Sequence, residues 1–424
     1  EVRGICYLQD GKFKVHAQPP KIDLRELPSP FRFEEDLPHL GKRIQYIETS
    51  RGCPFSCQFC LSSIEVGVRY FNREKIKEDI RFLMDHGAKT IKLEMFQFLI
   101  DEHKPGVVFQ FEITADIMRP EVIQFLNENA PKGLFRFEIG VQSTNDLTND
   151  LVKRRQNFEK LTRTVTMVKE GGKIDQHLDL IAGLPEEDYM SFRKTFNDVF
   201  AMRPEELQLG FLKLLRGTGL RVEAEKYGYT YVDVSPYEIF SNNVLSFDDI
   251  VRIKHAEDVL EKYWNAHRMD YTIEYLVNEV FETPFDFFQS FGTFWETKGW
   301  SRIGHQLDDL FKRLMEFLVT IPNINLQVVQ SIMQIDYLRS MSFNPRKFWW
   351  QERLSEEQQK EMMARIRKNH GLVSEKFAAL NISDKDLIKH SLIIPTYVDY
   401  DALTEGKVVP RKGHLFVYFF NGEK

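Results

Sequence analysis

The chain has few cysteines, only four among 424 residues. Such a count does not fit the evenly spaced cysteines of a disulfide-stabilised secreted protein. No apolar run approaches the roughly 20 residues of a membrane-spanning helix. The formal net charge is −6, and acidic and basic residues are interspersed, without the basic stripe that tracks a phosphate backbone. We therefore expect no membrane and no nucleic acid as the main partner, and a reducing, cytoplasmic location.

The sequence also lacks an initiator methionine, because it starts at Glu1-Val2-Arg3. We expect it to be a fragment, with room for a targeting segment upstream. Its length suits two or three domains. A second irregularity is internal: a strand-like stretch at 90–93 runs directly into a helix-like stretch that starts at Glu94. A parallel strand-to-helix connection usually needs about two to six residues, so we expect missing residues between Leu93 and Glu94.

Three of the four cysteines lie within eight residues, as Cys53, Cys57 and Cys60 in a Cys-x3-Cys-x2-Cys pattern. Three thiolates so closely spaced on a loop suit three irons of a [4Fe-4S] cluster and leave the fourth iron open. Zinc usually takes four ligands, and no second Cys or His pair follows downstream. The spacing therefore favours an iron–sulfur site over zinc. The remaining thiol, Cys6, is expected to be an ordinary semi-buried residue.

From Ile44 onward, strand-like and helix-like stretches alternate six times. This order predicts a parallel sheet with crossover helices, which curls into a partial barrel because such crossovers are right-handed. The expected helices are Arg73–His86, Pro120–Asn127, Asn157–Glu170 and Tyr189–Ala201. The expected strands are 44–49, 90–93, 108–114, 134–141, 174–181 and 206–213.

Two of these strands alternate apolar and polar residues. Gln110, Glu112 and Thr114 share one face of the first, and Arg136, Glu138 and Gln142 share one face of the second. In a barrel wrapped by helices the apolar face points outward, so the polar face points into the lumen. A closed (β/α)8 barrel fills this space with Val, Ile and Leu, so a polar lumen indicates a ligand site. An antiparallel sheet with one face in water is the alternative.

The ends of the chain differ from the middle. Residues 1–43 hold a hairpin-like piece and a proline-rich connector, and 44–230 hold the barrel. Residues 231–424 are rich in aromatics and are expected to form a mainly helical domain. Its predicted elements include helices at Leu307–Val319 and Ser355–Lys368 and a strand at His414–Phe420.

The cysteine loop and three later motifs resemble the strand-end motifs of radical S-adenosylmethionine (SAM) enzymes, in the same order. The later motifs are Phe111–Asp116, Glu138–Ser143 and His177–Pro185. The resemblance implies a partial (β/α)6 radical SAM barrel, related to the TIM barrel. In that family SAM chelates the open iron of the cluster, and the cluster reduces SAM to methionine and a 5′-deoxyadenosyl radical. The glycine-rich motif after the family's second strand is absent here and would fall at the suspected gap.

The resemblance also implies site residues. Phe59, just before the last cysteine, corresponds to an aromatic residue near the adenine. Glu112, Gln142 and Asp179 correspond to SAM contacts, and Arg154 to an arginine that pairs with the SAM carboxylate. Arg154 could instead be a solvated helix charge, with Arg155 its immediate competitor, and each acidic residue could instead be a structural acceptor.

The flanks resemble a narrower class, the cobalamin-dependent radical SAM enzymes. Residues Gly4–Tyr7 and Asp23–Phe31 look like the connector that follows a cobalamin-binding domain, and Leu207–Thr218 and the aromatic C-terminal region look like one of its subgroups. The resemblance implies cobalamin bound by an upstream module and a possible methyltransferase that acts on an unactivated carbon. It also implies a small-molecule or peptide substrate and a reductase, flavodoxin or ferredoxin as electron donor. The alternatives are a radical SAM enzyme that rearranges or cyclises without methylation, and a non-catalytic iron–sulfur or zinc protein.

Overall fold

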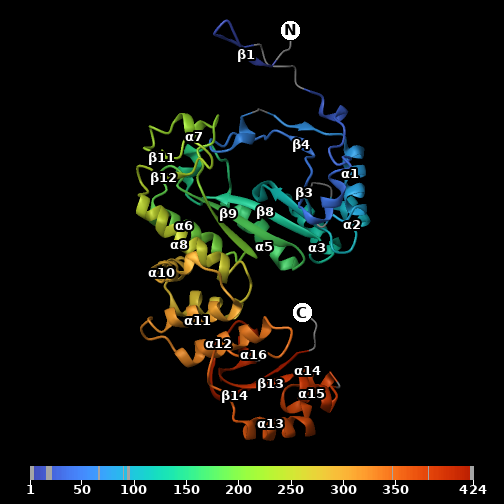
Figure 1. The fold of residues 1–424 in the computed structure, drawn as a ribbon, viewed down its shortest axis with the longest axis vertical. Coiled ribbons are helices and arrows are strands. Elements are labelled where there is room, and N and C mark those ends of the chain that lie inside the picture. Colours follow the sequence, from blue (N-terminus) through green and yellow to red (C-terminus); the bar gives the residue numbers. More distant parts are fainter. Residues whose placement is uncertain are drawn as a thin grey trace.

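A six-stranded parallel sheet forms the centre of the computed structural model, which describes residues 4–15, 22–64, 67–88, 90–92, 96–345, 347–380 and 382–420 (Figure 1). Neighbours in the sheet follow the order of the chain, and every pair is parallel. This succession, with helices between strands, confirms the expected partial (β/α)6 barrel. The strands are β3 (Gln45–Tyr46), β6 (Thr90–Lys92), β7 (Val108–Ile113), β8 (Phe135–Gln142), β9 (Asp175–Ala182) and β10 (Glu206–Phe211).

Several of the helices between these strands begin at polar capping residues. The Asn72 side chain accepts hydrogen bonds from the amides of Glu74 and Lys75, and Asn157 and Asp188 cap later helices in the same way. The four helices predicted from the sequence are present, with ends that differ by one or two residues. The crossover helices are α1 (Arg73–Asp85), α2 (Phe96–Glu102), α3 (Pro120–Asn129), α4 (Asp146–Leu151), α5 (Phe158–Gly171) and α6 (Tyr189–Phe200). The suspected gap between Leu93 and Glu94 lies outside the described residues.

The two faces of the sheet differ as the alternation predicts. On β8, the residues Phe135, Phe137, Ile139 and Val141 are fully buried, and the intervening side chains are half-exposed. Phe96 of α2 packs on this apolar face, with ring centroids 5.5 Å from Phe135 and 6.0 Å from Phe137. The helices therefore cover the apolar face, and the polar face is turned toward the hollow of the partial barrel.

The N-terminal segment forms the expected hairpin from β1 (Cys6–Gln9) and β2 (Lys12–Val15). Every residue of both strands is exposed, so the prediction that Cys6 is semi-buried is wrong. The reason is that the hairpin stands apart from the rest of the molecule (Figure 1). One of its faces is nevertheless apolar, with Leu8, Phe13 and Val15 about 70% exposed.

After β10 the chain continues through α7 (Gly219–Val222) and the short pair β11 (Thr230–Tyr231) and β12 (Ile239–Ser241), and then becomes helical. Rings of α10 pack against α6, with Phe285 5.3 Å from Phe196 between centroids. This region extends away from the barrel, toward the end of the molecule opposite the hairpin of β1 and β2 (Figure 1). Its helices are α8 (Phe247–Tyr263), α9 (Asp270–Tyr275), α10 (Pro284–Thr297), α11 (Leu307–Leu318) and α12 (Leu326–Arg339).

The last part of the chain has a small core of its own. Ile366, Phe377, Leu387 and Ile393 form this core, over the antiparallel pair β13 (Ser391–Val398) and β14 (Pro410–Phe419). The predicted terminal strand His414–Phe420 overlaps β14, which ends one residue earlier, whereas β13 was not predicted. The short elements here are α13 (Glu356–Lys368), α14 (Glu375–Ala379), α15 (Asp384–His390) and α16 (Tyr400–Thr404). Among the described helices, none is long and apolar enough to cross a bilayer.

Candidate functional site

The three clustered cysteines lie on a loop between the paired strands β4 (Ser50–Arg51) and β5 (Arg69–Tyr70). All three are free thiols; Cys57 is buried, and Cys53 and Cys60 are half-buried. The loop is held at Gln58, whose amide donates to the Val152 carbonyl at 2.9 Å and whose carbonyl accepts from the Leu220 amide at 3.0 Å. These backbone contacts fix the loop against the segment after α4 and the start of α7.

The chemistry of the loop fits an iron–sulfur cluster in donor type and number. Burial raises the pKa of the Cys57 thiol, the nearby charge of Arg154 opposes this, and Cys60 and Cys53 add to the increase. A metal that binds there must displace the proton. The three thiols match in type and number but are not gathered around a common point, and neither is any other group of three or more His, Cys, Asp and Glu side chains within the described ranges.

Gln142 lies at the carboxyl end of β8 in a strained conformation. Its φ is 70°, and the Ser143 amide donates to the Val141 carbonyl at 2.9 Å, across Gln142. This three-residue turn with positive φ at its centre is rare for a residue other than glycine. The pairing of β8 with β9 shifts register at the same point. Such strain is concentrated at functional sites.

Gly140, two residues earlier, makes room for this arrangement. A Cβ atom at Gly140 would lie 2.3 Å from Nε2 of Gln142 and 3.8 Å from Nη2 of Arg154. Arg154 donates to the Gly140 carbonyl and, through Nε, to Oε1 of Gln156 at 3.0 Å. Its competitor Arg155 is exposed. The structure thus brings Arg154, Gln142 and the cysteine loop to one place.

The remaining predicted contacts lie on or beside the same face. Asp179 of β9 is in register with Gly140, next to Gln142 and Arg154. Glu112 is farther away, on β7, in register with Glu138 of β8. Phe59 is half-buried and packs against the main core, with no hydrogen bond or ring contact to Gln142, Arg154 or Asp179 among the described residues.

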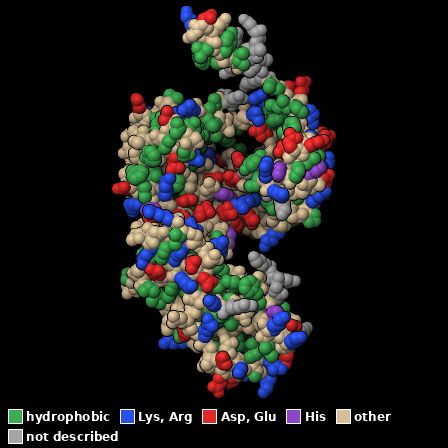
Figure 2. Space-filling model, viewed as in Figure 1, with side chains coloured by type: hydrophobic (Ala, Val, Ile, Leu, Met, Phe, Trp, Pro, Cys, Tyr) green, Lys and Arg blue, Asp and Glu red, His purple; other side chains and the backbone are tan. Residues whose placement is uncertain are grey.

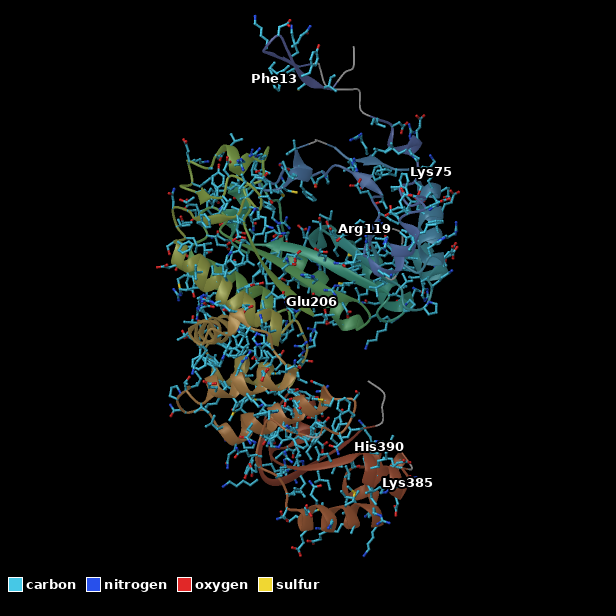
Figure 3. All side chains as sticks on the ribbon, viewed as in Figure 1. Phe13, Lys75, Arg119, Glu206, Lys385 and His390 are labelled. Atoms are coloured by element: carbon cyan, nitrogen blue, oxygen red, sulfur yellow. The ribbon has the colours of Figure 1, made fainter. Side chains whose placement is uncertain are left out.

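A charged network that sequence reasoning missed crosses the floor of the hollow. Arg136 pairs with Glu206, and its Nη2 lies 3.3 Å from Nδ1 of His177. The other ring nitrogen of His177 lies 3.1 Å from Oδ1 of Asp179, although the two atoms are not aligned as a hydrogen bond. Burial lowers the pKa of His177, but Asp179 and Glu206 outweigh it, so the net pKa is raised. Acidic, basic and histidine side chains gather in this hollow (Figure 2), and Figure 3 labels Glu206 on its floor.

A second missed group lies behind Gln142. Glu187, in the loop after β9, is fully buried and accepts hydrogen bonds from the hydroxyls of Ser143 at 2.6 Å and Thr195 at 2.7 Å. Burial raises the pKa of Glu187 to about 7, against these two hydrogen bonds. His177 shares its strand parity with Asp179, which could have pointed to it. Glu187 carries no comparable signal in the sequence.

Two family models match the chain. Residues 47–199 match the radical SAM superfamily, and residues 225–416 match a family described only as a protein of unknown function, DUF4080. The first match covers β4, the cysteine loop, Gln142, Arg154, Asp179 and Glu187. The second begins after α7 and ends within β14.

Curated relatives are distant. The chain is 24% identical over 265 residues to the anaerobic magnesium-protoporphyrin IX monomethyl ester cyclase of Rubrivivax gelatinosus, which covers 55% of this chain and 47% of the relative. It is 25% identical over 200 residues to a probable threonylcarbamoyladenosine tRNA methylthiotransferase of Pyrococcus abyssi, with 41% and 46% covered. The chain therefore spans about half the length of these relatives.

Solved structures with a similar arrangement are also distant in sequence. The cobalamin-dependent SAM radical enzyme OxsB, with aqua-cobalamin and SAM bound, shares 17% identity at a TM-score of 0.44, covering 89% of this chain and 60% of that chain. The radical SAM methyltransferase TsrM of Kitasatospora setae shares 14% identity at a TM-score of 0.38, covering 48% and 44%.

Proposed function

Residues 47–199 form a radical SAM domain, and from this premise we propose that Cys53, Cys57 and Cys60 hold one [4Fe-4S] cluster beside a SAM pocket on the polar face of the sheet. The observation that carries the proposal is the cysteine loop itself. Of its three free thiols, Cys57 interacts with Arg154, which lowers the pKa of that thiol. When bound, the cluster supplies the electron that cleaves SAM to methionine and a 5′-deoxyadenosyl radical.

The protein's own contribution is to bind and orient SAM and to keep water from the reacting atoms. Arg154 suits the SAM carboxylate, because a guanidinium binds a carboxylate in two places. Gln142 offers both a donor and an acceptor, and its Oε1 is buried without a partner among the described residues. Asp179 and Glu112 would accept from the ribose hydroxyls or the ammonium group, and Phe59 is assigned to the adenine by the family resemblance alone.

We further propose that the complete protein depends on cobalamin and transfers a methyl group to an unactivated carbon. The support is the segment Gly4–Phe31, which resembles the connector after a cobalamin-binding domain. Its hairpin exposes an apolar face, and two strands alone are marginally stable in water. A module packed on this face, above the barrel, would bring a corrinoid to the hollow. A small-molecule or peptide substrate and a flavodoxin, ferredoxin or reductase complete the proposal.

Anaerobic reconstitution tests the cluster. We expect about four irons and four sulfides per chain, and loss of SAM cleavage in Cys53→Ala, Cys57→Ala and Cys60→Ala variants. Cys6→Ala is the matched control, because that thiol lies on the hairpin. Stoichiometric zinc without sulfide would refute the proposal in favour of a zinc protein.

The methyltransfer part has its own test. The intact gene product, expressed with a corrinoid supply, should copurify with it and show cobalamin absorption. A cluster-containing protein that cleaves SAM but retains no corrinoid would leave a radical SAM enzyme that rearranges or cyclises its substrate without methylation.

A further inference from the structure

We propose that Glu187 is a positioning residue of the SAM pocket: from the loop after β9 it holds Ser143, and through Ser143 it keeps Gln142 in its strained turn. This inference rests on the proposed function, because it assigns a role at the same pocket. Glu187 touches none of the groups proposed to bind SAM. It acts through its neighbour.

The strained turn needs support from outside β8. A residue other than glycine at a φ of 70° is disfavoured by contacts of its own Cβ. The register shift at Gly140 and Gln142 also removes regular ladder pairing at this point. Strain of this kind persists only where the surroundings determine the conformation.

Ser143, the residue after Gln142, is held in place by hydrogen bonds to the surrounding structure. It is fully buried, and each of its polar groups has a partner: its amide donates to Val141, and its carbonyl accepts from Nδ2 of Asn149 at 3.0 Å and Nε2 of Gln156 at 3.2 Å. Its hydroxyl accepts from the Asn145 amide at 3.0 Å and donates to Glu187. Glu187 is thus the only charged partner in this set.

Glu187 also fixes the next residue along. It accepts from the Thr195 hydroxyl, and the Thr144 amide donates to that same hydroxyl oxygen at 3.2 Å. The Thr144 hydroxyl donates to Asp198 of α6 at 2.8 Å. The two residues after Gln142 are therefore both tied to the segment that follows β9, with Glu187 between them. Gln142 owes its place in the pocket to this buried network.

The charged groups around Glu187 are few. The negative charge of Asp188, the next residue in the chain, disfavours the ionised form of Glu187. The Asp198 carboxylate accepts from Thr144. The direct partners of Glu187, Ser143 and Thr195, are neutral. Whether Glu187 is ionised or neutral, its Oε1 accepts hydrogen bonds from the hydroxyls of Ser143 and Thr195. A glutamine retains that acceptor, whereas an alanine leaves two buried hydroxyls without one.

The test measures binding and loop rigidity separately. S-Adenosylhomocysteine, which is not cleaved, is titrated into the reconstituted full chain at pH 8, and hydrogen exchange is followed by mass spectrometry over residues 142–149. We expect Glu187→Ala to weaken binding about tenfold or more, as for loss of a buried acceptor, and to speed exchange in this segment. Glu187→Gln should stay within about threefold of the wild type.

Glu186→Gln is the matched control, because the adjacent side chain is exposed. If the alanine variant fails to fold, Glu187→Asp replaces it in the test. Aspartate keeps the charge, but its shorter side chain moves the carboxylate away from the Ser143 and Thr195 hydroxyls, so we expect the effects predicted for alanine. Unchanged affinity and unchanged exchange in a folded Glu187→Ala or Glu187→Asp protein would overturn the inference. Failure of the proposed function would appear instead as a wild-type protein without iron and sulfide, and the exchange measurement would still decide the role of Glu187.

Discussion

Arg154 stands between the cysteine loop and the end of β8, and its charge acts on both. It donates to the Gly140 carbonyl, and it lowers the pKa of Cys57 against the increase caused by burial. Thiolate, not thiol, is the reactive form of cysteine. The reactivity of Cys57 in the metal-free protein therefore reports on Arg154.

We expect Arg154→Gln to slow alkylation of Cys57 by iodoacetamide at pH 8 roughly threefold or more, because the thiol loses a cation that lowers its pKa. Mass spectrometry of the metal-free chain gives the rate at each cysteine, and Cys6 on the hairpin is an internal reference. The control is Arg155→Gln, which changes the charge of the next, exposed residue. An equal effect in both variants would show that only net charge matters.

Asp336, in the last turn of α12, is wholly buried, and burial raises its pKa to about 7 although hydrogen bonds from Thr272 oppose this. In the unfolded chain the group titrates near its ordinary pKa of about 4. The folded chain therefore holds the proton more tightly. Proton binding by Asp336 thus stabilises the folded chain. This contribution is fully present below about pH 4 and is lost as the pH rises to about 7.

Asp336→Asn should remove this dependence. From pH 5 to pH 8 the wild type should lose about 2–3 kcal/mol of unfolding free energy relative to the variant. Urea denaturation of both proteins at the two pH values measures this difference. Asp401→Asn, at an exposed aspartate, is the control and should follow the wild type. A parallel loss in all three proteins would assign the effect to other groups.

At the scale of elements, α8 and α10 approach so closely that only glycine fits at one crossing point. A Cβ at Gly292 would lie 2.2 Å from the carbonyl oxygen of His255, and backbone of this kind does not move aside easily. Elsewhere in a helix, alanine is better than glycine by about 1 kcal/mol. At position 292 the contact with the His255 carbonyl oxygen makes glycine more favourable than alanine.

Gly292→Ala should therefore destabilise the protein by about 1–3 kcal/mol, the usual range for overpacking. Thermal unfolding of the variant is compared with that of Gly304→Ala, where a Cβ meets nothing within 4 Å and the change should be within about 0.5 kcal/mol. A Gly292→Ala protein as stable as the wild type would mean that the two helices separate without cost.

Most strands and helices of the barrel were predictable from local patterns, although the strand predicted at 44–49 is only Gln45–Tyr46 and α4 was not predicted. β13 was not predicted either, because Pro395 lies in its middle and proline normally argues against a strand. Pro395 is tolerated here in a two-stranded sheet, opposite Leu415. The proposal that Cys53, Cys57 and Cys60 are ligands came from their spacing in the sequence.

The rest of the site is invisible to local patterns. His177 meets Arg136 from 41 residues away, Arg136 meets Glu206 from 70, and Ser143 meets Glu187 from 44. Such contacts depend on strand order and register, which a single sequence does not specify. Only the structure shows that Arg154 turns toward Gly140 while Arg155 is exposed.

At the scale of the whole molecule, the barrel and the helices after it share one core. Residues from Leu40 to Phe420 belong to a single cluster of buried side chains. Phe196 and Phe200 of α6 contact Phe288 of α10, and Arg193 of α6 pairs with Asp286 at 2.5 Å. The region that matches DUF4080 therefore completes the barrel's helical layer.

A chain that ends at residue 224 should consequently be insoluble, because the fully buried rings of Phe196 and Phe200 would face water. The measurement is the soluble fraction after expression. Full-length Arg193→Gln is the control: it removes the ion pair alone, a contribution of about 1 kcal/mol or less at a half-exposed site, and should remain soluble. A soluble, monomeric truncated barrel would show that the two regions fold separately.

The hairpin of β1 and β2 sets how this chain behaves when concentrated. Leu8, Phe13 and Val15 lie together on one side of a ribbon whose edges carry open backbone groups. In dilute solution this side meets only water. At high protein concentration, the apolar side of one hairpin contacts that of another molecule. The strands that would pack on a neighbouring module then promote self-association. The second virial coefficient from light scattering should therefore be negative for this chain and turn positive once Leu8 and Phe13 are replaced by serine.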